Sequence, residues 1–224
     1  MLKPDDLINK VKSYNKFLNP ETLNKAYYFA VKAHENQKRH SGDPYVIHPV
    51  AVANILSDLK LDSATIATGL LHDTIEDTHA TYQTIKQEFG QEVADLVEGV
   101  TKISAFENQA LSISKAENFR KLIIATSKDI RVLLVKIADR LHNMRTIKYL
   151  KDDNKKKKIS NETLEIFAPL ADRIGVRQLK DELEDLAFEV LNPDAKSTII
   201  KRINFLKSQG KSNIKLIIQQ LQDV

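Results

Sequence analysis

Two histidines of this chain stand beside residues that suit metal chemistry. His48 lies between an isoleucine and a proline, and His72 is followed directly by Asp73. Glu76 and Asp77 follow this pair at i+4, so the four side chains share one flank of a predicted helix. Carboxylates on an otherwise apolar helix need a cation or a basic partner. The pattern therefore indicates a polar cluster that could hold a metal ion.

Asp139 adds a carboxylate from a second helical segment. Asn143 and Thr146 follow it at spacings that place the three side chains on one face. Two imidazoles with two carboxylates suit Mn, Fe, Zn or Co and leave coordination positions open for water, which the metal would activate for attack on phosphorus. Each motif alone also fits a structural role, such as an Asp paired with Arg140 or Arg145. Their combination favours the metal site.

The elements that must position these residues are helices. Apolar residues recur at helical spacing along nearly the whole chain, and no stretch alternates with the period of a strand. Only 6 Gly and 6 Pro are present, too few for the turns of a β-sandwich or barrel. We therefore predict an all-α fold of about ten helices. The expected helices lie near residues 20–37, 48–56, 62–77, 82–89, 91–101, 114–127, 129–149, 160–170 and 176–191, followed by two short ones.

The helix expected over residues 129–149 is the one that carries Asp139. Apolar residues at i, i+3 and i+4 form one stripe along it, and two valines lie on the opposite side together with Asp139. A helix that is apolar on two faces is expected at the centre of its domain. Residues 38–46 are rich in turn-forming types and are expected to form an ordered loop ahead of His48.

The composition excludes several classes of protein. Cysteine is absent, which rules out disulfides and thiolate metal sites. The 224 residues are 42% hydrophobic and 29% charged, as in an ordinary globular chain. No apolar run approaches the ~20 residues that span a bilayer, and the N-terminus lacks the apolar region of a signal peptide. We therefore expect no membrane partner and a cytoplasmic location.

The net charge of +4 is concentrated at the C-terminal end. Residues 194–224 hold six Lys or Arg against two Asp, so they carry +4 and residues 1–193 sum to zero. This distribution argues against a nucleic-acid partner, and the run Lys155–Lys158 is expected to form a solvated turn. We predict one domain over residues 1–193 and a basic, amphipathic helical tail over residues 194–224. The apolar stripes of the tail are expected to pack on the domain.

The order of His48, His72-Asp73 and Asp139 resembles the HD superfamily of metal-dependent phosphohydrolases. The flanking segments are similar, over roughly residues 20–193, to the hydrolase region of Rel/Spo-type alarmone enzymes. These segments are RHSGDPYVIHPVAVA, GLLHDTIEDT, VADLVEGVTKIS, ENFRKLIIATSKDIRVLLVKIADRLHNMRT and APLADRIGVRQLKDELEDLAFEVLNP. That family uses manganese to degrade guanosine tetra- and pentaphosphate, (p)ppGpp, to GDP or GTP plus pyrophosphate. The resemblance therefore implies an HD-type helical bundle and a (p)ppGpp 3′-pyrophosphohydrolase of the bacterial stringent response.

The resemblance also assigns roles to residues of this chain. The residues that it assigns to the metal, Mn²⁺ or another divalent transition metal, are His48, His72, Asp73 and Asp139. The pair that it assigns to activating and orienting the attacking water is Glu76 and Asp77. The residues that it assigns to the nucleotide are Arg39, Ser41, Asn143 and Thr146. Arg39 is expected to stack on guanine, because its planar cation can face an aromatic ring.

Three positions qualify the resemblance. His40 stands where the family often has Lys, and we expect it to contact substrate as a weaker, pH-dependent cation. Asp172 stands where a His is common, with no consequence that the sequence reveals. Lys102 fits either a phosphate contact or a solvated surface lysine, and it is included among the candidate substrate-binding residues.

The long members of the family continue into a synthetase domain, and nothing in this sequence resembles one. The chain is therefore either a hydrolase on its own, with the opposing activity on a separate synthetase chain, or a fragment. The tail leaves a homo-oligomer open. Two other functions remain alternatives: a phosphohydrolase of the same fold that acts on another phosphorylated nucleotide, and an idle module that binds the alarmone without turnover.

Overall fold

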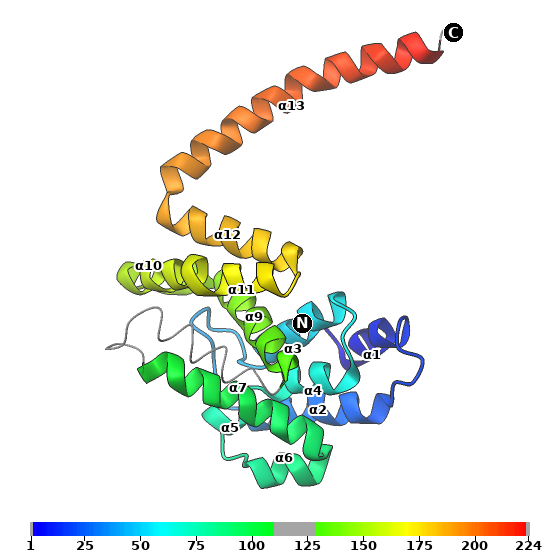
Figure 1. Ribbon diagram of the computed structural model, residues 1–224, viewed down its shortest axis with the longest axis vertical. Helices are drawn as coiled ribbons and strands as arrows, with labels where there is room; N and C mark the ends of the chain where they lie inside the picture. The colour runs from blue at the N-terminus through cyan, green and yellow to red at the C-terminus, as the bar shows by residue number, and fades with distance from the viewer. Residues whose placement is uncertain (1, 110–128, 223–224) are drawn as a thin grey trace.

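The computed structural model of the chain describes residues 2–109 and 129–222 and is built from helices (Figure 1). The α-helices are α1 (Pro4–Lys12), α2 (Pro20–Ala33), α3 (Ile47–Asp58), α4 (Ser63–Leu71), α5 (Thr74–Asp77), α6 (Tyr82–Phe89), α7 (Gln91–Gln109), α9 (Ile130–Arg145), α10 (Asp153–Glu162), α11 (Ala168–Arg173), α12 (Arg177–Leu191) and α13 (Pro193–Gln222). A 3₁₀ turn at Ile147–Tyr149 and a π-helical turn at Thr163–Phe167 complete the order. No strand occurs in these two ranges, which confirms the all-α prediction. The helix expected over residues 114–127 lies outside the described residues.

Three helices in the middle of the molecule form the core around the predicted metal ligands (Figure 1). α3 and α4 pack on one another and α9 contacts both, while α2 and α7 pack against α4. Leu70, Leu71 and Ile137 are fully buried in this core. Gly69 lets α3 approach α4 closely, because a Cβ at this position would lie 2.6 Å from Leu56 Cδ1. The packing brings together segments that are far apart in the sequence.

Helix α9 is central, as predicted, and ends earlier than expected. It contacts α3, α4, α7 and α12, and most of its apolar residues are buried together with Asp139, whereas Ile130 at its start is 51% exposed. The helix ends at Arg145 and not at Tyr149. Thr146 leaves the helical conformation, and its hydroxyl donates to the carbonyl oxygen of His142 at 3.0 Å. The backbone N–H of Thr146 donates to the same carbonyl at 3.1 Å, and the chain then continues into the 3₁₀ turn.

Asp129 caps α9, and its contribution to stability depends on pH. Its carboxylate accepts the backbone N–H of Arg131 at 2.9 Å and the guanidinium at 2.7 Å. The Arg131 hydrogen bonds lower the pKa of Asp129 from 3.8. The stabilisation is therefore present above pH 3.8 and is lost as the pH falls through the lowered pKa.

We expect Asp129→Ala to lower the free energy of unfolding by about 1 kcal/mol near pH 7, as loss of an N-cap does. The difference from the wild type should shrink as the pH falls below 3.8, because the carboxylate is protonated first in the unfolded state and then, below its lowered pKa, in the folded state as well. Urea unfolding of both proteins at neutral and at acidic pH measures this difference. A difference that stays the same at both pH values would contradict the prediction.

The segment around His72 is not the single continuous helix that its spacing predicted. α4 ends at Leu71, and α5 begins only at Thr74. His72 Nδ1 lies 2.9 Å from the carbonyl oxygen of Gly69, and the Thr74 hydroxyl donates to that of Leu71 at 2.6 Å. A continuous helix would use both carbonyls for its own backbone, so these side chains interrupt it. His72 and Asp73 therefore lie in a turn between two helices.

The lysine run is helical, so the prediction of a solvated turn was wrong. Lys155–Lys158 lie within α10. Asp152 is the N-cap of this helix, and its carboxylate accepts the backbone N–H groups of Asn154 and Lys155 at 2.9 and 3.1 Å. An aspartate in this position starts a helix ahead of the lysines. Downstream, the π-helical turn joins α10 to α11.

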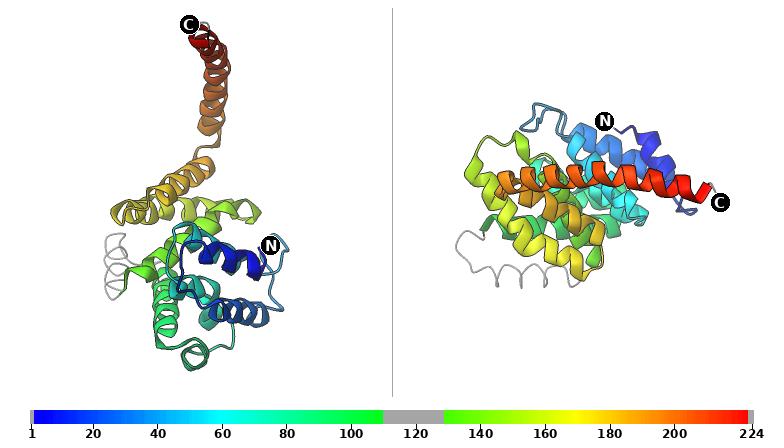
Figure 2. Two further views of the ribbon diagram at one scale, coloured as in Figure 1. Left: turned by 90° about the vertical axis from the view of Figure 1, so that its right-hand side faces the viewer. Right: turned by 90° about the horizontal axis from the view of Figure 1, so that it is seen from above.

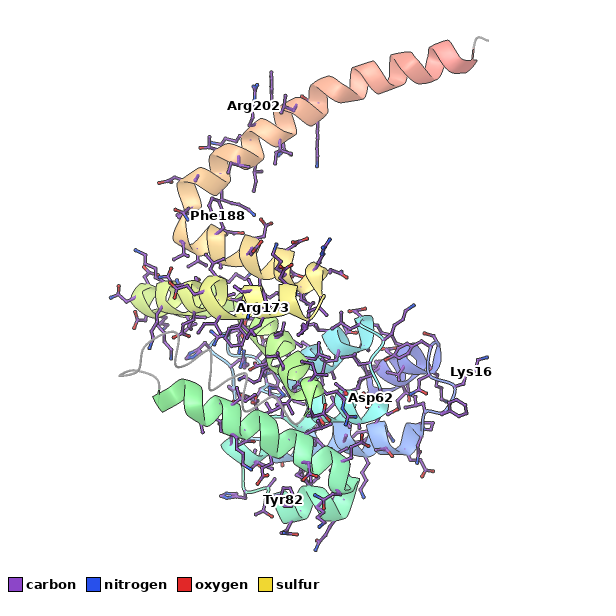
Figure 3. The ribbon with its side chains drawn as sticks, viewed as in Figure 1. Lys16, Asp62, Tyr82, Arg173, Phe188 and Arg202 are labelled. Carbon is purple, nitrogen blue, oxygen red and sulfur yellow. The ribbon has the colours of Figure 1, made fainter. Side chains whose placement is uncertain are left out.

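The tail is one helix, α13, and not the two short helices that were expected. It contacts α12 and projects away from the other helices (Figure 1, Figure 2). Figure 3 shows side chains such as Arg202 extending from it with no other helix beside them. Ile199 and Leu206 are 48% and 52% exposed, so the expected packing of the apolar stripe on the domain is wrong for this part of α13. Among the described residues, no helix combines the length and the apolar character needed to cross a membrane.

Candidate metal centre

Three parts of the core bring the four residues predicted to bind metal to one place. His48 lies in the first turn of α3, His72 and Asp73 lie between α4 and α5, and Asp139 lies along α9. One donor atom from each of His48, His72 and Asp139 lies within 4.8 Å of the other two, and all three residues are buried. The Asp73 carboxylate oxygens lie 3.1 Å from His72 Nε2 and 3.5 Å from His48 Nε2. The structure thus gathers all four.

The hydrogen bonding of His72 fits a metal ligand. The carbonyl oxygen of Gly69, which can only accept, lies 2.9 Å from His72 Nδ1, so this nitrogen carries a proton. Nε2 is buried and makes no hydrogen bond, although Asp73 Oδ1 lies 3.1 Å away. Buried polar atoms normally have a partner. A divalent cation among these nitrogen and oxygen donors would provide one.

The carboxylates of the cluster favour positive charge between them. Burial disfavours the charged form of His72, but the carboxylates of Asp73 and Asp139 outweigh this effect and raise its pKa to about 9. Burial alone would raise the pKa of Asp139, but the Lys136 ammonium and then His48 hold that pKa well below its usual range. The cluster therefore stabilises a cation placed among its donors.

His48 is oriented by a second histidine, His142, which the sequence places beside the face of Asp139 and for which it left open either the orienting of a carboxylate or simple packing. The two Nδ1 atoms lie 2.7 Å apart. Burial lowers the pKa of His142 to about 3, with help from His48 and Arg39, so its ring is neutral near pH 7. A neutral His142 can accept a hydrogen bond from His48 Nδ1, which leaves His48 Nε2 facing Asp139 Oδ1 at 3.2 Å. Such partners commonly orient metal-binding histidines.

Glu76 and Asp77, predicted to act on water, lie beside the metal cluster. Both line a cavity of about 190 Å³ together with His48, Asp73 and Asp139. Burial raises the pKa of Glu76, and the charges of Asp73 and Asp77 raise it further. A raised pKa makes a carboxylate a better proton acceptor. The predicted pair therefore faces the same space as the predicted metal ligands.

Two further residues of this cavity were not identified from the sequence. The Tyr45 hydroxyl lies 2.8 Å from Asp73 Oδ2 and 3.0 Å from Asp77 Oδ2. Lys136 is 5% exposed, and its ammonium donates to Asp139 Oδ2 at 3.0 Å. The signal for Lys136 was a lone lysine in an apolar stretch, three residues before Asp139. Tyr45 gave no such signal, since its position depends on the fold of the loop that carries it.

A larger cleft of about 870 Å³ adjoins the cavity. The residues predicted to bind substrate that line it are Arg39, His40, Ser41, Asn143 and Thr146. Three more basic residues of its lining are Arg140, Lys155 and Lys158. The cleft and the cavity share Arg39, His48 and Asn143. The two spaces therefore meet at the metal cluster.

Arg39 is linked to the metal cluster through Asn143. Arg39 Nη2 donates to Asn143 Oδ1 at 2.8 Å, and Asn143 Nδ2 donates to Asp139 Oδ1 at 2.7 Å. The guanidinium also lies 5.4 Å from the centre of the Tyr45 ring. A substrate bound against Arg39 would therefore be connected through Asn143 to Asp139, a predicted metal ligand.

Two residues singled out in the sequence lie elsewhere. Lys102 is exposed on α7, donates to Glu98 Oε2 at 2.7 Å and lines neither the cleft nor the cavity. Asp172 is exposed near the end of α11 and lines neither space. Lys102 is thus the one predicted substrate-binding residue that the structure does not bring to the cleft.

Comparison with known proteins adds independent information. Residues 26–177 match the family model described as "HD domain". The chain is 47% identical over all its 224 residues to "GTP pyrophosphokinase rsh" of Brucella melitensis biotype 1, of which it covers 30%. It is 48% identical over 200 residues to "Bifunctional (p)ppGpp synthase/hydrolase SpoT" of Escherichia coli strain K12, and this match covers 89% of the chain and 28% of the relative.

A solved structure is similar as well. It is titled "A metazoan ortholog of SpoT hydrolyzes ppGpp and plays a role in starvation responses" and is 25% identical in sequence, with a TM-score of 0.58. The match covers 79% of this chain and 98% of that chain. In contrast, the chain spans only about 30% of the length of the curated relatives that it matches.

Proposed function

Because this chain belongs to the HD domain family, and within it to the Rel/Spo type, we propose that it is a metal-dependent (p)ppGpp 3′-pyrophosphohydrolase of the cytoplasm. The observation that carries the proposal is the meeting of two spaces at Arg39, His48 and Asn143. One space contains the acidic pair and donors of the metal cluster. The other, at about 870 Å³, has room for a nucleotide, and the four Arg and Lys side chains of its lining outnumber its three acidic ones.

The metal would be held by His48, His72, Asp73 and Asp139. We propose Mn²⁺, since a mixed set of imidazole and carboxylate donors suits such a metal. When bound, the cation supplies Lewis-acid chemistry, in which it draws charge from a phosphoryl oxygen and makes water easier to deprotonate. The neutral His142 and the carbonyl of Gly69 support this arrangement, because they keep the imidazoles of His48 and His72 in the required orientations.

The acidic pair would act on the attacking water. Glu76 has a raised pKa and lines the cavity, so it is suited to accept the proton that water loses. The water oxygen forms a bond to the phosphorus attached to O3′, the bond between that phosphorus and O3′ breaks, and O3′ takes up a proton. Asp77, whose carboxylate lies 3.0 Å from the Tyr45 hydroxyl, would orient the water.

The cleft would bind the nucleotide. Arg39, His40, Ser41, Asn143 and Thr146 are the proposed contacts, with Arg39 stacked on guanine. The basic side chains of the cleft would attract the phosphates. Lys102 remains a prediction from the sequence only. All residues that line the two spaces fall within the predicted domain over residues 1–193, and we propose that α13 is a linker-like tail outside it.

The first test is incubation of the purified protein with guanosine tetraphosphate and Mn²⁺, followed by anion-exchange separation of the nucleotides. We expect GDP and pyrophosphate in equal amounts, and a chelator should stop their formation. Binding without turnover would contradict the proposal in favour of an idle module. If guanosine tetraphosphate neither bound nor reacted, an adenosine 3′-phosphorylated substrate would be the next one to test. A separate synthetase chain or a homo-oligomer remains a prediction.

A further inference from the structure

Tyr45 contacts two carboxylates that have different proposed roles. Its hydroxyl lies 2.8 Å from Asp73 Oδ2 and 3.0 Å from Asp77 Oδ2. Asp73 stands at the start of α5 and Asp77 at its end. One side chain, which comes from the loop before α3, therefore bridges the two ends of this short helix.

The surroundings of Tyr45 hold the hydroxyl in place. The ring stacks on His34 at 4.7 Å between centres, and the backbone N–H of Tyr45 donates to the carbonyl of Gln37 at 3.0 Å. The Gln37 side chain accepts from His34 Nδ1 at 2.7 Å and donates to the backbone carbonyl of Asp77 at 2.7 Å. The loop is thus tied to the same end of α5 that the hydroxyl contacts, which limits movement of either one.

A phenol has one proton, and here it faces two carboxylate oxygens, so the two acceptors share it in a three-centre hydrogen bond. A carboxylate that accepts this hydrogen bond loses rotational freedom about its terminal bond. We infer that Tyr45 is a positioning residue that sets the orientation of both carboxylates, Asp73 toward the metal and Asp77 toward the attacking water. This inference rests on the proposed function, because the two carboxylates take their roles from it.

The test is a comparison of Tyr45→Phe with Tyr14→Phe. The Tyr14 hydroxyl donates to the carbonyl of Leu61 at 3.1 Å, so the control also removes one hydroxyl and one hydrogen bond, but outside the two spaces of the site. Calorimetric titration of Mn²⁺ into the metal-free proteins should show affinity about tenfold lower for Tyr45→Phe only. The kcat for guanosine tetraphosphate should fall about tenfold, with KM within about twofold of the wild type.

Equal Mn²⁺ affinity and kcat in the two variants would overturn the inference. The titration needs no substrate, so it still decides the role of Tyr45 toward Asp73 if the wild type fails to cleave guanosine tetraphosphate and the proposed function falls. A second comparison repeats Tyr45→Phe in the presence of Asp77→Asn. Tyr45→Phe lowers Mn²⁺ affinity by one factor when Asp77 is present and by another factor when Asp77 is replaced by Asn. If the hydroxyl links the two carboxylates, these two factors should differ by about threefold or more. The same factor in both would overturn the link.

Discussion

Glu76→Gln is expected to lower kcat for (p)ppGpp hydrolysis by about 10²- to 10⁴-fold, the usual contribution of a positioned proton acceptor. The amide keeps the size of the side chain but cannot accept the proton of water. Mn²⁺ affinity should fall by less than about tenfold, which is the smallest loss expected when a residue that hydrogen-bonds to a metal ligand is removed. Glu76 lines the cavity beside the cluster and is not one of the residues that form it.

The control for this substitution is Glu98→Gln on α7. Glu98 accepts from Lys102 and lies outside both spaces of the site, so its loss should leave kcat and Mn²⁺ affinity unchanged. Full activity of Glu76→Gln would remove Glu76 from the mechanism. A large loss of Mn²⁺ affinity would instead make it a ligand, which calorimetry distinguishes directly.

Asp139→Ala is expected to weaken Mn²⁺ binding by more than about 100-fold, beyond the loss typical of residues that only support a ligand. Hydrolysis should be lost with it. The substitution also removes the carboxylate that lies 3.0 Å from the buried Lys136 ammonium and the acceptor for Asn143. We therefore expect the free energy of unfolding of the metal-free protein to fall by about 3 kcal/mol, as when one partner of a buried ion pair is removed.

The companion variant adds Lys136→Met to Asp139→Ala. It removes the buried charge together with its partner, so most of the lost stability should return, whereas Mn²⁺ binding should not. Urea unfolding and calorimetric titration measure the two effects separately, and Asp172→Ala is an exposed carboxylate control. Recovery of Mn²⁺ binding in the double variant, or full binding in Asp139→Ala, would exclude Asp139 as a ligand.

The predicted ligands could be grouped from the sequence because residue type and order carry the information. His48, His72, Asp73 and Asp139 have side chains that can share one cation, and the packing of α3, α4 and α9 brings them together. The helices themselves follow from apolar periodicity, which a bundle with a single core preserves along most of its length.

The break between α4 and α5 could not be predicted in the same way. Apolar periodicity continues through His72, but the side chains of His72 and Thr74 bond to carbonyls of the preceding turn. This competition depends on side-chain rotamers that spacing does not reveal. Neither Tyr45 nor the actual partner of His142, which is His48 and not a carboxylate, could be found for a related reason, since each contact is made across the packed core and not along one helix.

The lysine run was misread although a local signal was present. Asp152 directly precedes the helix, and an aspartate before a polar stretch is as much a helix start as one before an apolar stretch. Charge alone suggested a solvated turn. The structure instead puts Lys155 and Lys158 on a helix that lines the cleft.

The π-helical turn at Thr163–Phe167 has a consequence for comparing relatives of this chain. Such a turn contains one residue more than the same length of α-helix. Because one residue of an α-helix corresponds to about 100° of rotation, the turn rotates α10 by about that angle relative to α11. The turn therefore determines the direction in which Lys155 and Lys158 point when Leu170 is buried in the core; in this chain both lysines line the cleft. A relative that aligns with a one-residue gap here would therefore point its cleft lysines in another direction, even if every one of them were conserved.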